Sequence, residues 1–143
     1  MHRLLHRLAV VLAMLALAAC AGIGANQRED DSFGIVTFNL YHDKADWPAR
    51  RLLVIDGLRA LQPDVIVLQE VLQDDGLRNQ AEDLAQVLGY SAYFISIDAP
   101  DRTRRYGNAI LTRHPVSARD WTPLRPLDDS RTAGMLGIGL GGR

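Results

Sequence analysis

The fold is decided by residues 33–70, where two apolar stretches flank a helical one. The first stretch, FGIVTFNL (residues 33–40), is rich in β-branched and aromatic residues and predicts a buried strand that ends near Asn39. The second, DVIVLQE (residues 64–70), has four consecutive apolar residues followed by a polar tip. It predicts a second buried strand that ends at Glu70.

A helix is expected between these two strands. Asp46 can cap its start, and Pro48 is tolerated in the first turn. Gln62-Pro63-Asp64 ends it after Leu61, because a residue that precedes proline disfavours helical geometry. The predicted helix has one apolar stripe at i, i+4 and i+7, formed by Val54, Leu58 and Leu61.

A strand–helix–strand unit of this kind predicts two parallel strands, because a crossover helix returns the chain to the same edge of the sheet. Asn39 and Glu70 are then expected at the carboxyl ends of neighbouring strands. The carboxyl edge of an open α/β sheet is where ligands usually bind. The pattern therefore predicts an α/β fold with a site at this edge.

The rest of the chain predicts further alternation of short elements in the same domain. A second helix is expected from Leu77 or Asn79 to Leu88, with Gly89 as its stop. Further strands are expected over residues 90–97, 108–112, 116–121 and 134–140.

The composition is that of an ordinary globular protein and excludes several classes. Of the 143 residues, 48% are hydrophobic and 23% are charged, which excludes a highly charged disordered chain. The formal net charge of −1 gives no global basicity that would indicate nucleic-acid binding. The single cysteine excludes an internal disulfide framework and a cysteine-rich zinc module.

Residues 1–20 have the pattern of an export leader. Arg3 and Arg7 precede an unbroken apolar run, residues 8–19, which is shorter than the roughly 20 residues of a membrane-spanning helix. The sequence LAAC (residues 17–20) resembles the lipobox of bacterial lipoproteins, in which Cys20 would be lipidated and become the new N-terminus. A plain secretory signal and an uncleaved anchor are the alternatives, and all three export the chain. Residues 21–32 lack a periodic apolar face and are expected to be a tether.

Four polar residues are candidates for chemistry. Glu70 can ligate a hard divalent cation at the sheet edge, or can be a surface carboxylate that caps a loop. Asn39 offers an amide oxygen to a metal and an amide donor to an anion, although asparagine is also common where strands turn. His42, and less favourably His114, can act as acid–base groups or be solvated loop histidines.

Three segments, taken in order and spacing, resemble the endonuclease/exonuclease/phosphatase superfamily, which includes nucleases related to DNase I, sphingomyelinases and inositol phosphatases. They are IVTFNL (residues 35–40), PDVIVLQEV (residues 63–71) and YGNAILTRHPV (residues 106–116). The resemblance covers residues 33–142. It implies the N-terminal half of a four-layered α/β sandwich of the DNase I type and a metal-dependent hydrolysis of phosphate esters.

The resemblance also implies roles for individual residues. Asn39 would orient the phosphate or the catalytic water and contact the metal, and Glu70 would hold Mg²⁺ or Mn²⁺. Tyr106 and Asn108 would line the phosphate pocket. The implied substrates are nucleic acid or phospholipid, and export together with a lipidated Cys20 favours a substrate outside the cell or in the membrane.

The sequence also departs from the family pattern. Family members are about twice as long and carry later Asn-Thr-His, Gly-Asp-x-Asn and Ser-Asp-His segments, none of which occurs here. We therefore expect residues 33–143 to be a domain truncated before its C-terminal motifs, without a general base. Such a chain would be inactive alone and would expose apolar sheet surface. A surface-anchored, non-catalytic binding module and an incomplete gene product are the alternatives.

Overall fold

Six strands and two helices make up the part of the chain that the computed structural model describes, residues 32–125 and 131–140. Cys20, the export leader and the tether up to residue 31 lie outside these residues. Among the described residues, no helix is long and apolar enough to cross a membrane. In chain order the elements are β1 (Ile35–Asn39), α2 (Trp47–Leu61), β2 (Val65–Gln73), α3 (Gln80–Leu88), β3 (Ser91–Ile95), β4 (Arg105–Thr112), β5 (Val116–Pro123) and β6 (Thr132–Ile138).

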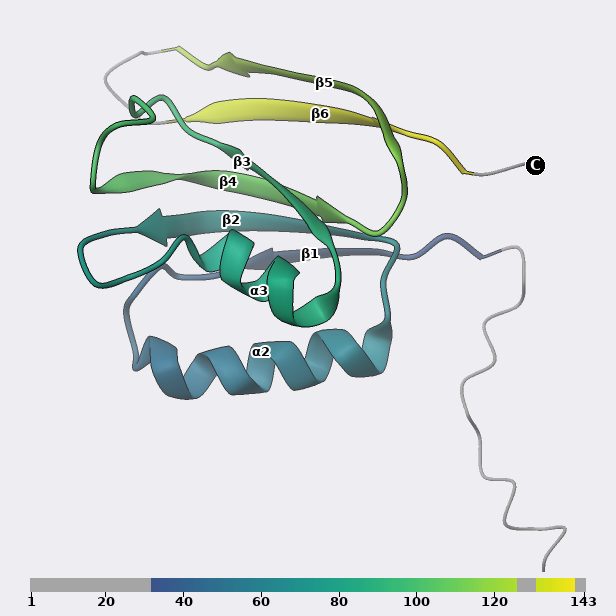
Figure 1. Cartoon of the computed structure of the whole chain (residues 1–143), viewed down its shortest axis with the longest axis horizontal. Helices are drawn as coiled ribbons and strands as arrows, with labels where there is room; N and C mark the ends of the chain where they lie inside the picture. Colours follow the sequence, from purple (N-terminus) through teal and green to yellow (C-terminus); the bar gives the residue numbers. More distant parts are fainter. Residues whose placement is uncertain (1–31, 126–130, 141–143) are drawn as a thin grey trace, which may run out of the picture. The chain divides into compact units, whose positions relative to one another are not determined.

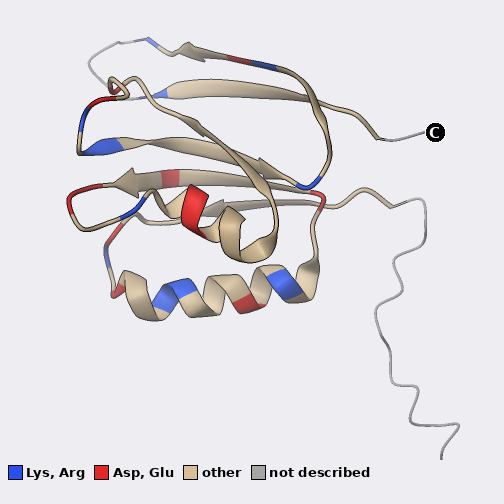
Figure 2. Ribbon diagram, viewed as in Figure 1, with Lys and Arg blue, Asp and Glu red and all other residues tan. Residues whose placement is uncertain are grey.

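The strands form a four-stranded sheet in the order β1-β2-β4-β3 and a separate β5–β6 hairpin (Figure 1). β1 and β2 are parallel, in register from Ile35 opposite Val65 to Asn39 opposite Gln69, which confirms the prediction. β4 runs antiparallel to both β2 and β3. The carboxyl ends of β1 and β2 therefore share one edge, where loops carry charged residues of both signs (Figure 2).

Both helices begin and end on the expected signals. The Asp46 carboxylate accepts from the backbone N–H of Ala49 at 3.3 Å at the start of α2. Asn79 caps α3 by accepting from the backbone N–H groups of Ala81 and Glu82 at 3.0 and 3.2 Å. Gly89 ends α3 with a φ of 77°, a left-handed conformation that costs glycine little.

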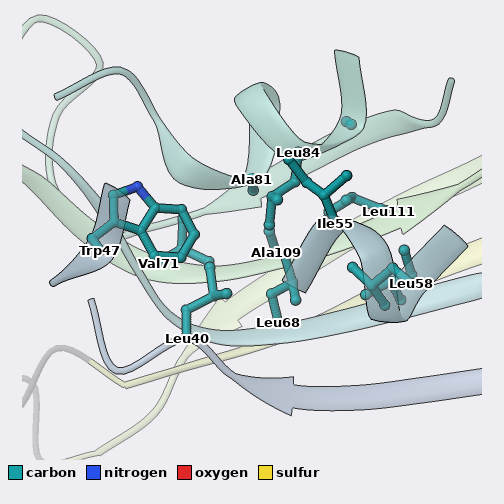
Figure 3. Close-up of a cluster of buried hydrophobic side chains, with 12 residues drawn as sticks. Leu40, Trp47, Ile55, Leu58, Leu68, Val71, Ala81, Leu84, Ala109 and Leu111 are labelled. Carbon is teal, nitrogen blue, oxygen red and sulfur yellow. The ribbon is translucent and has the colours of Figure 1, made fainter. Parts of the chain in front are cut away.

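The buried stripe of α2 agrees with the predicted one at Leu58 and, in part, at Val54, which packs against the core, but differs at Leu61. The residues of α2 that are buried are Trp47, Ile55 and Leu58, whereas Leu61 is 61% exposed. The stripe is rotated because α3 packs beside α2 on the same face of the sheet, and Ile55 points toward Leu84 of α3 (Figure 3). A sequence period cannot reveal the position of a neighbouring helix.

The hydrophobic core lies between the two helices and one face of the sheet (Figure 3). The cross-strand pairs Ile66–Leu111 and Leu68–Ala109 point from β2 and β4 toward the helices. Each fully buried leucine or isoleucine contributes about 1.5–3 kcal/mol relative to an exposed one. The core is completed by Leu40, Trp47, Ile55, Leu58, Val71, Ala81, Leu84 and Ala85.

Apolar surface is exposed along β1, as the sequence led us to expect. Within the described residues β1 pairs only with β2, and Ile35 and Phe38 are 63% and 38% exposed. A groove of about 300 Å³ between β1 and α2 is lined only by apolar residues and one glycine: Val36, Phe38, Leu53, Val54, Gly57, Leu58 and Leu61.

A buried carboxylate, Asp64, joins three segments at the amino end of β2. It accepts from the Gly34 backbone N–H at 2.7 Å, from Arg113 Nη2 at 3.0 Å and interacts with His114 Nε2 at 2.8 Å. Burial alone would raise the pKa of Asp64. The hydrogen bonds from Gly34, His114 and Arg113 have the larger, opposite effect and hold this pKa well below its usual range.

We predict that Asp64→Asn lowers the free energy of unfolding by about 3 kcal/mol at pH 7, because it leaves Arg113 and His114 without their charged partner. Since the folded-state pKa of Asp64 is depressed, the wild-type advantage should be complete above the unfolded pKa of about 3.9 and shrink as pH falls below it. Urea denaturation at several pH values measures this. The exposed Asp75→Asn is the control, and an equal loss in both variants would contradict the prediction.

Candidate active site

Glu70 lies at a β-bulge inside β2 and not at the end of the strand, which corrects the sequence prediction. β2 continues to Gln73, and its pairing with β4 shifts between Leu68 and Val71. Two residues, Gln69 and Glu70, therefore face the single residue Asn108 between the paired positions Ala109 and Gly107. Glu70 has a φ of 54°, the left-handed conformation that redirects its side chain. The apolar pattern carries no signal for such a bulge.

The segment that connects β1 to α2 is hydrogen-bonded to this bulge. The backbone N–H of Leu40 donates to the Gln69 carbonyl at 2.9 Å, and that of His42 donates to the Glu70 carbonyl at 3.1 Å. Tyr41, His42, Ala45 and Asp46 all have positive φ, between 35° and 55°. Each such residue costs of the order of 1 kcal/mol or more, and strain of this kind persists only where other contacts fix the backbone.

Arg50 of α2 holds much of this strained backbone in place. Its guanidinium donates to the carbonyl of Leu40 at 2.8 Å, of His42 at 3.1 Å and of Ala45 at 3.0 Å. The guanidinium also lies 5.4 Å from the ring centroid of Trp47. It also donates to the Lys44 carbonyl, from Nη2 at 2.5 Å and from Nε at 3.1 Å. One side chain therefore binds four carbonyls that the turning backbone cannot pair internally.

Gln80 of α3 provides the second support and is fully buried. Its Nε2 donates to the His42 carbonyl at 2.9 Å, and its Oε1 accepts from the Leu72 backbone N–H at 3.0 Å. The amide thus joins the loop after β1 to the part of β2 beyond the bulge. Neither Arg50 nor Gln80 was predicted from the sequence. Each forms hydrogen bonds to backbone atoms several or many residues away, and such contacts leave no pattern in the sequence.

The side chains of Glu70, His42 and Tyr106 come together at this edge. Glu70 Oε2 lies 3.7 Å from His42 Nε2, and His42 Nδ1 lies 3.1 Å from Asp43 Oδ1. The Tyr106 ring meets the imidazole edge-on, with centroids 5.8 Å apart. Burial, together with the negative charge of Glu70, raises the pKa of Tyr106, whereas the bond to His42 lowers the pKa of Asp43.

The two predicted asparagines have different surroundings. Asn39 is exposed, pairs in register with Gln69, and accepts from the Tyr41 backbone N–H through Oδ1 at 2.8 Å, which leaves its amide N–H₂ available. Asn108 donates to Thr132 Oγ1 at 3.2 Å and so contacts the β5–β6 hairpin. His114 lies at the opposite end of β2 from Glu70, beside Asp64, and is not part of this site.

Glu70 has few neighbouring side chains that could ligate a metal ion or donate a hydrogen bond to it. Across residues 32–125 and 131–140, no group of three or more histidine, cysteine, aspartate or glutamate side chains could hold a metal ion. The Glu70 carboxylate accepts no hydrogen bond from this described part of the chain, and its side chain is 32% exposed. A partly buried carboxylate that accepts no hydrogen bond from the described residues and lies 3.7 Å from an imidazole nitrogen is a suitable partial coordination set for a divalent cation.

Comparison with known proteins identifies the class. The sequence model of the Endonuclease/Exonuclease/phosphatase family matches residues 36–142, and the chain belongs to this family. No curated protein sequence matches the chain significantly.

Solved structures of the same fold are similar to about three quarters of the chain. They include a family protein from Leptotrichia buccalis (TM-score 0.61, 22% identity, 75% of this chain and 50% of that one). A family protein from Beutenbergia cavernae has a TM-score of 0.57 at 20% identity, over 77% of this chain and 35% of that one. The human Nocturnin catalytic domain with bound sulfate has a TM-score of 0.56 at 21% identity, over 78% and 46%. The chain thus spans half or less of each of these structures.

We predict that Gln80→Met lowers the free energy of unfolding by about 2 kcal/mol, because the buried Leu72 N–H loses its acceptor. Hydrogen exchange at the His42 amide should become faster, since the loop also loses a support. Urea denaturation and hydrogen-exchange mass spectrometry measure the two effects. Gln86→Met, on the exposed side of α3, is the control; if it matches Gln80→Met in both measurements, the proposed support is wrong.

Proposed function

We propose that this protein is an exported, divalent-metal-dependent hydrolase of phosphodiesters, with nucleic acid or phospholipid as its substrate class. The observation that carries the proposal is the Glu70 carboxylate, which a bulge directs to the carboxyl edge of the parallel β1–β2 pair without a hydrogen-bond donor from the described residues. Membership of the family supports hydrolysis of phosphate esters.

The residues present fit a hard divalent cation such as Mg²⁺ or Mn²⁺. Glu70 supplies a carboxylate and Asn39 an amide oxygen, and such ions accept one or two protein oxygens together with water and phosphate oxygens. When bound, the ion would neutralise charge on the phosphoryl oxygens and the leaving oxygen. The similar structure of the human Nocturnin catalytic domain contains a bound sulfate anion.

The chain's own side chains bind and orient the phosphate in this proposal. The free amide N–H₂ of Asn39 donates to a phosphate oxygen or holds the attacking water. The Tyr106 hydroxyl is protonated at neutral pH, as that of any tyrosine is, and can donate to a phosphoryl oxygen. Asn108 lies opposite the bulge and contacts the hairpin through Thr132.

Export and anchoring are part of the proposal. The lipobox-like sequence that ends at Cys20 supports lipidation and attachment to the cell envelope, with residues 21–32 as the tether. A plain secretory signal would instead release the protein. In either case the hydrolase would meet nucleic acid outside the cell or the phospholipid of a membrane.

We also propose that the general base and the remaining ligands come from a segment outside these 143 residues. Two observations support this: the chain spans only 35–50% of the solved structures, and the groove between β1 and α2 exposes apolar side chains. A further strand beside β1 would cover Ile35 and Phe38. The 143-residue chain should therefore have no phosphodiesterase activity of its own.

We predict that the protein purified from its source hydrolyses bis(4-nitrophenyl) phosphate with Mg²⁺ or Mn²⁺, and that its intact mass exceeds that of residues 20–143 plus lipid. Glu70→Gln should reduce kcat/KM at least about 100-fold, because it removes the charged ligand. Glu82→Gln, on the exposed surface of α3, is the matched control.

Three results would each contradict a different part of this proposal. A native mass that equals residues 20–143 plus lipid, with no turnover, would leave a non-catalytic surface module. Turnover by the 143-residue chain alone would refute its proposed inactivity. Full activity of Glu70→Gln would refute the proposed metal site.

A further inference from the structure

Two hydrogen-bond acceptors face each other at the site. The Asp43 carboxylate can only accept, so the contact of His42 Nδ1 with Asp43 Oδ1 at 3.1 Å puts the imidazole proton on Nδ1. In the neutral ring the lone pair is then on Nε2, which lies 3.7 Å from Glu70 Oε2. A lone pair and a carboxylate oxygen at this separation attract each other only through a proton or a cation held between them.

The distance favours a cation. A charge-assisted N–H···O bond is about 2.7–2.9 Å long, well short of the 3.7 Å found here. Two ligand atoms that each bind one divalent ion at about 2.1 Å lie 3 Å or more apart, close to the observed separation. The two atoms can therefore share an ion with only a small movement of either side chain.

Backbone hydrogen bonds hold His42 and Glu70 in positions from which they could share an ion. The backbone N–H of His42 donates a hydrogen bond to the Glu70 carbonyl at 3.1 Å, so the backbones of the two residues are in direct contact. The His42 carbonyl accepts from Gln80 at 2.9 Å and from Arg50 at 3.1 Å. His42 and Glu70 both have left-handed φ values, 35° and 54°, and strain of this kind clusters at ligand sites, where the surroundings enforce it.

The surroundings of the imidazole match those of a metal-binding histidine. Such a histidine almost always donates its second ring N–H to a carboxylate or carbonyl, which orients the ring and raises the basicity of the other nitrogen. Asp43 occupies that position here, and the rings of Tyr41 and Tyr106 flank the imidazole with centroids 5.7 and 5.8 Å away. The ring is thus both oriented and confined.

We propose that His42 Nε2 is a cation ligand alongside Glu70, and that the site therefore takes Mn²⁺ in preference to Mg²⁺. The preference follows because imidazole nitrogen suits transition-metal ions, whereas Mg²⁺ favours oxygen ligands and retains water. This inference rests on the metal site of the proposed function and adds to it a nitrogen ligand and a metal preference.

The test is Mn²⁺ binding to the protein purified from its source and to its variants, followed by electron paramagnetic resonance. The free Mn²⁺ signal measures Kd, and electron spin-echo modulation detects an imidazole ¹⁴N bound to the ion. We expect ¹⁴N modulation in the wild type. His42→Asn should abolish it and raise Kd at least about tenfold. Asparagine is chosen because it tolerates the left-handed backbone of position 42. Mg²⁺ should displace Mn²⁺ only in large excess.

The controls separate failure of this inference from failure of the proposed function. His114→Gln, which changes the imidazole beside Asp64, should keep the ¹⁴N modulation and the Kd. Bound Mn²⁺ without ¹⁴N modulation, with Kd unchanged in His42→Asn but raised in Glu70→Gln, would overturn the role of His42 and leave the Glu70 site intact. Absence of Mn²⁺ binding, or binding unaffected by Glu70→Gln, would overturn both.

Discussion

The parallel pairing of β1 with β2 is the constraint on which the rest of the structure depends. Parallel strands require a crossover, and α2 provides it while covering one face of the sheet. The same pairing sets Asn39 beside Gln69 and brings both carboxyl ends to one edge. The hydrogen bonds of the ladder continue past β1, from Leu40 and His42 to the bulge, so the pairing also fixes the loop that completes the site.

The strained backbone at this edge is held by groups that belong to the core. Arg50 extends from α2 to four loop carbonyls, and the buried Gln80 extends from α3 to the His42 carbonyl and the Leu72 N–H. Packing of the two helices on the sheet therefore determines the positions of His42 and Glu70. A change in the core would be transmitted to the site through these two side chains, even though neither lies beside the Glu70 carboxylate.

The chain belongs to the Endonuclease/Exonuclease/phosphatase family, and this membership bears on how the arrangement at the sheet edge is interpreted. In a chain of this family, the described residues bring a carboxylate, an imidazole and a tyrosine ring together at one edge of the sheet. The apolar groove along β1 lies on the side of the sheet where a further strand could add.

The sequence by itself determined the strand–helix–strand unit, the parallel pair and the position of Glu70 near its edge, because apolar periodicity and capping residues act locally. Only the tertiary structure decided three other features: the bulge at Glu70, the rotated buried face of α2, and the contact between His42 and Glu70. Each depends on contacts between residues far apart in the chain, with β4, with α3 and across the loop. Such contacts have no period in the sequence, and tertiary packing alone fixes them.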